Sequence, residues 1–236
     1  MKLFIVFIIF TLLIIFLYKN SIKEEINYTI LGEKNLFSNN LKSKNFSDLL
    51  FDELIKEKKF GFYSKDFIDN DIRIVDLINY INNNKTTNEI TIQNILKRTN
   101  LLLLNIGNNE INYKLSKVDE YTNENDIYNY LDEVSTDLFK LIDLIKKYNS
   151  DNIILMGYYN DTSNIQNDKY YKYINNKVKE FCKANNIYYT DLFSLLNKNE
   201  DYLTKTNPIY ITNEGNLAIF DKLYSKIDCL YLHKVN

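Results

Sequence analysis

Four short segments hold the residues that could do chemistry, because each joins a glycine to acidic, amide, basic or phenolic side chains. They are Gly32-Glu33-Lys34-Asn35, Gly107-Asn108-Asn109-Glu110, Gly157-Tyr158-Tyr159-Asn160 and Asn207-Pro208-Ile209-Tyr210-Ile211-Thr212-Asn213-Glu214-Gly215. Such groups can bind polar ligands or transfer protons. The chain has a single histidine, His233, which lies beyond the last of these segments. A nucleophile paired with a base of near-neutral pKa is therefore not evident from residue types alone.

Strands and helices are predicted to alternate between these segments. Continuous apolar runs at 28–31, 101–106 and 153–156 are typical of central parallel strands, and 60–67 and 187–189 also have strand character. Helical spacing predicts helices over 46–58, 72–81, 92–98, 170–184 and 217–227. This order predicts a three-layer α/β/α fold, with a doubly wound, flavodoxin-like parallel sheet. Ligands bind beyond the carboxyl ends of such strands, where three of the four segments lie.

A stripe of apolar side chains predicts a long amphipathic helix between residues 127 and 148. Its members are Ile127, Leu131, Val134, Leu138, Leu141, Ile145 and Tyr148. The alternating spacing of four and three residues also suits a coiled coil of about three heptads. A helix packed on the sheet and a coiled coil both remain open at this point.

The order and spacing of the four segments resemble the SGNH/GDSL hydrolase family, over roughly residues 27 to 230. In that family the first strand ends in Gly-Asp-Ser-Leu, with Ser as nucleophile. A later Gly-x-Asn-Asp block supplies an Asn that donates to the oxyanion, and a final Asp-x-x-His block precedes the last helix. Membrane-anchored bacterial members often carry a Gly-x-Tyr-Asn segment, similar to residues 157–160. The resemblance implies the three-layer fold and an ester hydrolase site.

Most of the family's catalytic residues do not carry over to this chain. Lys34 stands at the position of the nucleophilic Ser, while Asn207 and Tyr210 stand where the Asp and the His would be. Asn109 matches the oxyanion Asn. Asp71 takes the place of the Gly whose backbone would be the second oxyanion donor.

These replacements remove the hydrolytic mechanism. Lys34 would be protonated at pH 7 unless burial strongly lowered its pKa. Tyr210 has a reference pKa of ~10 and is a poor base at neutral pH, and Asn207 carries no charge to stabilise a protonated base. We therefore predict a catalytically inactive pseudoenzyme that binds a ligand or partner at the former active-site cleft.

The predicted ligand is a small molecule, a glycan or a protein. The residues predicted to bind it are Glu33, Lys34, Asn109, Tyr158, Tyr159 and Asn160. An ion pair of Lys34 with Glu110 or Asp71 is expected to fill the vacated pocket.

Two other functions remain open. The chain could be an active esterase or lipase, acting on acyl, glycan or lipid esters, with a non-standard catalytic set. Such a set could be Ser38 or Ser64 with Lys34, or an acid pair of Glu110 with Glu33 or Asp71, which could also form a cation site. The third function is a structural scaffold on a membrane anchor.

The N-terminus predicts a membrane attachment. Residues 3–18 are apolar except for Thr11, and no small-x-small cleavage site follows them. We predict a transmembrane signal anchor over 1–20, a tether over 21–26 and the hydrolase-like domain over 27–236. A cleaved signal peptide is the alternative. The expected location is the cell membrane, with a single pass and an extracytoplasmic domain.

Composition excludes several classes of protein. The chain is 45% hydrophobic with a net charge of −2, so a packed core is expected and disorder is not. Nucleic acid is not a predicted partner, because no basic excess offsets phosphate charge. Cys182 and Cys229 lack paired CxxC spacing and a histidine partner, so no metal is predicted. No motif predicts a cofactor.

Overall fold

The computed structural model describes residues 11, 25–34, 44–57, 60–149, 151–160, 165–197, 199–204 and 211–232. Apart from Thr11, the predicted anchor lies outside these residues, as do Ser38, Asn207, Tyr210 and His233. None of the helices described here has both the length and the apolar character needed to span a membrane.

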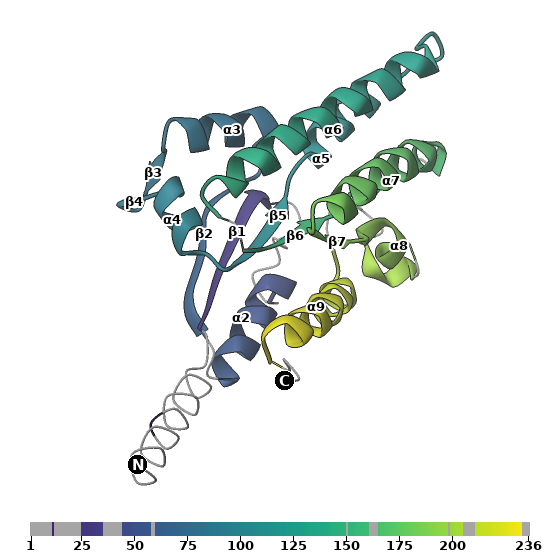
Figure 1. Ribbon diagram of the computed structural model, residues 1–236. Helices are drawn as coiled ribbons and strands as arrows, with labels where there is room; N and C mark the ends of the chain where they lie inside the picture. The colour runs from purple at the N-terminus through teal and green to yellow at the C-terminus, as the bar shows by residue number, and fades with distance from the viewer. Residues whose placement is uncertain are drawn as a thin grey trace, which may run out of the picture.

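Five parallel strands form the central sheet, in the order β2-β1-β5-β6-β7 (Figure 1). Their bounds are β1 Ile26–Glu33, β2 Phe60–Asp69, β5 Leu101–Asn105, β6 Asn152–Met156 and β7 Tyr188–Thr190. In the register, Ile30 lies opposite Leu103, which in turn lies opposite Ile154. The predicted doubly wound sheet is confirmed, including the adjacency of the three apolar runs.

Side chains alternate between the two faces of the sheet, and both faces are buried. On β5, Leu102 and Leu104 enter one hydrophobic cluster, while Leu101 and Leu103 enter the other. This burial on both sides explains why the strand sequences are continuous apolar runs rather than alternating ones.

Helices cover both faces and complete three layers (Figure 1). One layer holds α3 Ile74–Asn82, α4 Ile92–Arg98, α5 Asn108–Leu115, α6 Glu124–Lys146 and α7 Asp168–Ala184. The other holds α2 Phe46–Lys56, α8 Leu192–Leu196 and α9 Asn213–Ile227. Two 3-10 turns, Ile165–Asn167 and Glu200–Tyr202, and a π-helical stretch, Asp228–Leu232, connect or extend these helices.

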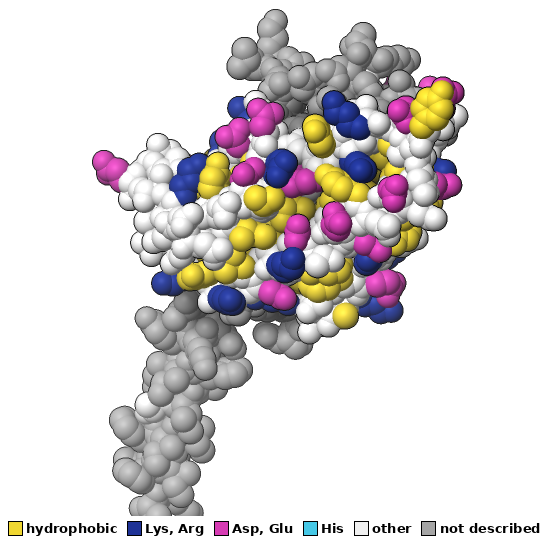
Figure 2. Space-filling model, turned by 90° about the horizontal axis from the view of Figure 1, so that it is seen from above, with side chains coloured by type: hydrophobic (Ala, Val, Ile, Leu, Met, Phe, Trp, Pro, Cys, Tyr) yellow, Lys and Arg dark blue, Asp and Glu magenta, His cyan; other side chains and the backbone are white. Residues whose placement is uncertain are grey.

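Helix α6 settles the two alternatives for the apolar stripe. Its residues Ile127, Leu131, Leu138, Leu141 and Ile145 are buried in the hydrophobic cluster that residues of the sheet, α3 and α7 also enter. The stripe is therefore the face of a helix packed on the sheet. Outside this stripe, the surface above the layer mixes apolar side chains with charges of both signs (Figure 2).

Several elements differ from the sequence-based expectation. Helices α5 and α8 and the hairpin of β3 Thr86–Thr87 with β4 Ile90–Thr91 were not predicted. Strand β5 ends one residue before Ile106. The hairpin turn contains Asn88 and Glu89, both with positive φ. Glutamate rarely adopts this conformation, so the sequence did not indicate a turn here.

Gly32 is a position that tolerates no side chain. Its φ is +110°, and a Cβ there would lie 2.0 Å from the Asn105 carbonyl oxygen. Gly32→Ala is expected to lower the free energy of unfolding by at least about 2 kcal/mol, because backbone strain and a backbone clash add. Urea denaturation followed by circular dichroism measures the loss.

Gly61→Ala is the control for this substitution. Gly61 lies in β2 without a positive φ, and the nearest atom to its added Cβ is the end of the Asn27 side chain, which can rotate. An equal loss in both variants would contradict the special constraint at Gly32.

Candidate functional site

The site lies at the carboxyl ends of β1 and β5, where the chain's winding direction reverses. Strand β1 pairs with β2 on one side and with β5 on the other. The Asn105 side chain, at the end of β5, donates to the Glu33 carbonyl oxygen at 2.9 Å. This is the topological switch point of the sheet, the usual ligand position in such folds.

The Glu33 side chain is fully buried at this switch point. Its Oε1 accepts from the backbone N–H of Gly107 at 2.6 Å and from that of Asn109 at 3.1 Å. Gly107 is the N-cap of α5 and provides no side chain of its own. The Glu33 carboxylate therefore satisfies donors at the start of α5, in charge-assisted bonds that the positive helix end strengthens.

Asn109 is half-buried, and its side chain is fully engaged with the protein. Nδ2 donates to the carbonyl oxygens of Asn70 at 2.9 Å and of Ile72 at 3.0 Å. A side-chain amide nitrogen carries two hydrogens, so both of them are used. Asn109 thereby fixes the loop that joins β2 to α3.

Glu110 fastens the other end of the same loop. Its Oε1 accepts from the backbone N–H of Ile74 at 2.6 Å, at the first residue of α3. Burial raises the pKa of the Glu110 carboxyl above its ordinary value, and the bond from Ile74 opposes that shift. The Tyr130 hydroxyl donates to the Glu110 carbonyl oxygen at 3.1 Å, which ties α6 to this strand end.

Lys34 follows Glu33 directly but is exposed. Within the described part of the chain it forms no ion pair, so the predicted pairing with Glu110 or Asp71 is wrong. The reason is geometric: the Glu110 carboxylate is buried and turned toward Ile74, and Asp71 is exposed in the adjacent loop.

The segment after β6 is held in the core. Tyr158 is 2% exposed and Tyr159 is 1% exposed, and the two rings enter opposite hydrophobic clusters. The Asn160 Nδ2 donates to the Asp168 carboxylate at 2.8 Å, at the start of α7. Ligand binding by these three residues stays a prediction. Ser64, the other proposed nucleophile, donates its hydroxyl to Asp66 at 2.7 Å.

Buried polar atoms without a protein partner gather at the same strand end. Both amide atoms of Asn108, Oε2 of Glu110 and the Tyr158 hydroxyl are such atoms, and among the described residues the Tyr28 hydroxyl in β1 is a further one. The hydroxyl lies against Gly107, where an added Cβ would come within 2.6 Å of it. Burial and the nearby carboxylates of Glu33 and Glu110 raise the pKa of Tyr158. Buried polar groups of this kind are ordinarily hydrogen-bonded to internal water.

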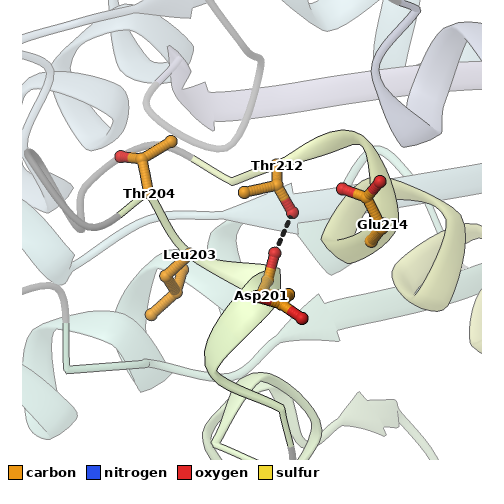
Figure 3. A pocket seen from close by; sticks show the side chains of 5 residues that line it. All are labelled: Asp201, Leu203, Thr204, Thr212 and Glu214. Carbon is orange, nitrogen blue, oxygen red and sulfur yellow. Dashed lines mark hydrogen bonds between the residues drawn. The ribbon is translucent and has the colours of Figure 1, made fainter.

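A cavity of about 360 Å³ lies beside the start of α9. Figure 3 shows its lining residues: Asp201, Leu203, Thr204, Thr212 and Glu214. The Thr212 hydroxyl donates to the Asp201 carbonyl oxygen at 2.5 Å and accepts from the backbone N–H of Gly215 as the cap of α9. Two acidic residues, two threonines and Leu203 give this cavity an acidic lining of mixed polar and apolar character. Among the residues described, no cluster of metal-binding side chains is present.

Comparison with solved structures identifies the fold. A lipase from a goat rumen metagenome has a TM-score of 0.72 and 15% identity, covering 84% of this chain and 95% of the lipase. An acetylxylan esterase from Geobacillus stearothermophilus has a TM-score of 0.64 and 14% identity, over 87% and 96%. A lipolytic G-D-S-L family protein from Veillonella parvula has a TM-score of 0.57 and 12% identity, over 84% and 96%. No protein-family model and no curated protein matches the chain.

The fold is therefore that of the SGNH/GDSL hydrolases, as the four segments predicted. Sequence reasoning placed Glu33, Asn109 and Glu110 at one end of the sheet, and the structure brings them together. It missed their partners, which are the backbone amides of Gly107 and Asn109 for Glu33 and backbone groups of residues 70–74 for the side chains of Asn109 and Glu110. It also missed Asp201 and Thr204 in the cavity. The one sequence signal of these hydrogen bonds was Asn105, a polar residue at the end of the otherwise apolar strand β5, whose side chain donates to the Glu33 carbonyl oxygen.

The bonds of Glu33 predict a large effect on stability. Glu33→Ala leaves the amides of Gly107 and Asn109 without their acceptor, at a cost of about 1–3 kcal/mol for each donor left buried. Glu33→Gln keeps an acceptor oxygen and should lose less. Thermal and urea unfolding give the ranking, with Glu124→Ala, an exposed first-turn glutamate of α6, as the control. Equal effects at Glu33 and Glu124 would contradict this role.

The raised pKa of Glu110 predicts a pH dependence of stability. Because the folded-state pKa lies above the ordinary value, protonation of this carboxyl favours the folded state. Its contribution is complete below the ordinary pKa and is lost as the pH rises through the folded-state value. Relative to Glu110→Gln, the natural chain should lose stability as the pH rises from below the ordinary carboxyl pKa toward neutrality. Denaturant midpoints for both proteins across that range test this, and a constant difference would refute it.

Proposed function

We propose that the chain is a membrane-anchored domain of SGNH hydrolase fold that binds a ligand or partner and does not hydrolyse esters. The observation that carries this proposal is the state of Asn109. In a hydrolase of this resemblance the Asn at this position donates to the oxyanion. Here both amide hydrogens are bound to the carbonyls of Asn70 and Ile72. An oxyanion would have to displace one of these carbonyls, at the expense of the loop.

The missing nucleophile and base support the same proposal. Lys34 offers no hydroxyl, and the sequence contains no histidine before His233. If the chain stabilises no oxyanion, the Asn109 amide can bind the loop carbonyls permanently without any loss of catalytic rate.

The alternative of an active esterase draws on the solved neighbours, two of which are named as a lipase and an acetylxylan esterase. It requires a nucleophile other than Lys34 and an oxyanion donor other than Asn109. Ser64 does not favour it, because its hydroxyl already bonds Asp66 within β2. The scaffold alternative is weaker than binding because the acidic cavity beside α9 provides a ligand-sized space.

The membrane part of the proposal rests on the sequence. The apolar residues 3–18 precede β1 by only a short polar stretch, so the domain would lie close to the bilayer. We propose a single pass with the domain outside the cytoplasm.

Hydrolysis of p-nitrophenyl acetate by the full chain tests the absence of activity. The natural protein should match a Lys34→Ala variant, and both should match the rate without protein. A variant with Lys34→Ser, Asn207→Asp and Tyr210→His restores the family's residue types. It should exceed the natural chain by on the order of 10²-fold, the range that a general base supplies.

Saturable turnover by the natural chain would overturn the proposed inactivity. A silent restored variant would withdraw the assignment of positions 207 and 210 while leaving the natural chain inactive. Thermal unfolding of all three proteins shows whether the substituted variants remain folded.

A further inference from the structure

The parallel topology gives the domain two opposite edges of different charge. Each of α2, α4, α6 and α7 ends a few residues before a strand begins, so these helices end at the edge where the strands start. We call this the amino edge and the opposite one, with the candidate site, the carboxyl edge. The eight residues of β1 separate the two edges by about 26 Å, at ~3.3 Å per residue.

Basic side chains are concentrated at the amino edge. They occupy the last turns or caps of the helices and are Lys56, Lys97, Arg98, Lys147, Lys183 and Lys226. Acidic residues at the same edge, among them Glu25, Glu53, Glu57, Asp151 and Asp228, offset much of this positive charge. Lys56 is itself paired with Glu53.

Acidic side chains are concentrated at the carboxyl edge. First turns of the helices there carry Asp48, Asp76, Glu110, Glu124, Asp168 and Glu214. Helix dipoles favour this placement of both signs, so each helix is stabilised by its own end charges. Because α2, α4, α6 and α7 all end at the amino edge, their end charges polarise the domain along the strands.

Aromatic rings accompany the basic groups at the amino edge. The Lys226 ammonium lies 4.1 Å from the ring centroid of Tyr188, and the Arg98 guanidinium lies 4.8 Å from that of Phe62. Both rings belong to the first residues of their strands and are half-buried. Lysine and arginine beside aromatic rings are the combination found at membrane–water interfaces.

We propose that the amino edge rests on the anionic headgroups of the bilayer, so that the candidate site faces away from the membrane. This inference rests on the proposed anchor, because the first described strand begins at the amino edge with Ile26. Charge gives an independent reason for the same orientation. An anionic surface attracts the basic edge and repels the acidic one, and their separation exceeds the ~8 Å Debye length at physiological ionic strength.

Cys229 provides a reporter at the amino edge. It is exposed and lies three residues beyond Lys226. The other cysteine, Cys182, is buried, and burial raises the pKa of its thiol to about 12. A thiol-reactive fluorophore will therefore label Cys229 selectively, since the thiolate is the reactive form.

The full chain, labelled at Cys229, is reconstituted into vesicles of phosphatidylcholine with or without about 30% phosphatidylglycerol. A headgroup spin-labelled lipid then quenches fluorophores close to the surface. Quenching should be at least about twofold stronger on the anionic vesicles, and roughly 0.5 M NaCl should remove the difference. Lys97→Glu with Lys147→Glu should also remove it.

A matched double variant separates this effect from a change in net charge. Lys117→Glu with Lys172→Glu changes the net charge equally, at exposed positions near the carboxyl edge, and should keep the stronger quenching. Equal quenching on both vesicle types, or equal losses in both double variants, would overturn the proposal. Retention on neutral vesicles after an alkaline wash reports the anchor separately. If the protein does not stay on neutral vesicles after the wash, the proposed anchor is wrong. Salt-sensitive quenching on the anionic vesicles still tests whether the amino edge binds anionic headgroups.

Discussion

The structure depends on one buried carboxylate at the point where the sheet changes direction. Glu33 ends β1, and its Oε1 accepts from the amides of Gly107 and Asn109, which begin α5. The approach is possible because Gly32 has no side chain to collide with the Asn105 carbonyl. A buried carboxylate is costly unless donors surround it, and the start of a helix supplies unpaired amides and a favourable dipole. Strand β1 and helix α5 are therefore fixed to each other, because the buried carboxylate requires donors and the first amides of α5 require an acceptor.

This constraint extends outward through neighbouring residues of the same turn. Once Glu33 holds the backbone of Asn109, the Asn109 side chain reaches the carbonyls of Asn70 and Ile72. The Glu110 carboxylate then accepts a hydrogen bond from the backbone N–H of Ile74, the first residue of α3. The Glu33 carboxylate and the Asn109 amide, which could otherwise face a substrate at this strand end, are bound instead to the protein. Asn109 is thereby held in place and is less able to stabilise a developing negative charge, since both of its amide hydrogens are already bound.

Sequence reasoning succeeded where burial alone decides the structure. The runs at 101–106 and 153–156 are apolar because both faces of the sheet are covered, and the stripe on α6 has the period of a helix packed on a core. It failed where a tertiary partner decides. Helix α5 has the sequence Asn-Asn-Glu-Ile-Asn-Tyr-Lys-Leu, in which three of eight residues are Asn, a residue of low helix propensity. Its N-terminus binds Glu33, and its own Ile111 is buried in the core.

The directions of the Lys34 and Glu110 side chains could not be predicted from the sequence either. Lys34 and Glu110 are of opposite charge and lie at neighbouring strand ends, which made an ion pair plausible from sequence order. The structure directs Glu110 inward to Ile74 and leaves Lys34 exposed, because an unpaired amide at a buried helix start competes for the same carboxylate. Spacing along the chain identifies which residues share a strand end. It does not say which of the available donors each carboxylate will accept.

The parallel topology links this site to the rest of the molecule. Parallel strands require every connecting helix to run back in the opposite direction, so helix starts and helix ends are sorted to opposite edges. End charges that stabilise single helices then add up to one acidic edge and one basic edge. The same rule that brings Glu33 to the start of α5 also gathers Lys97 and Lys226 at the far edge.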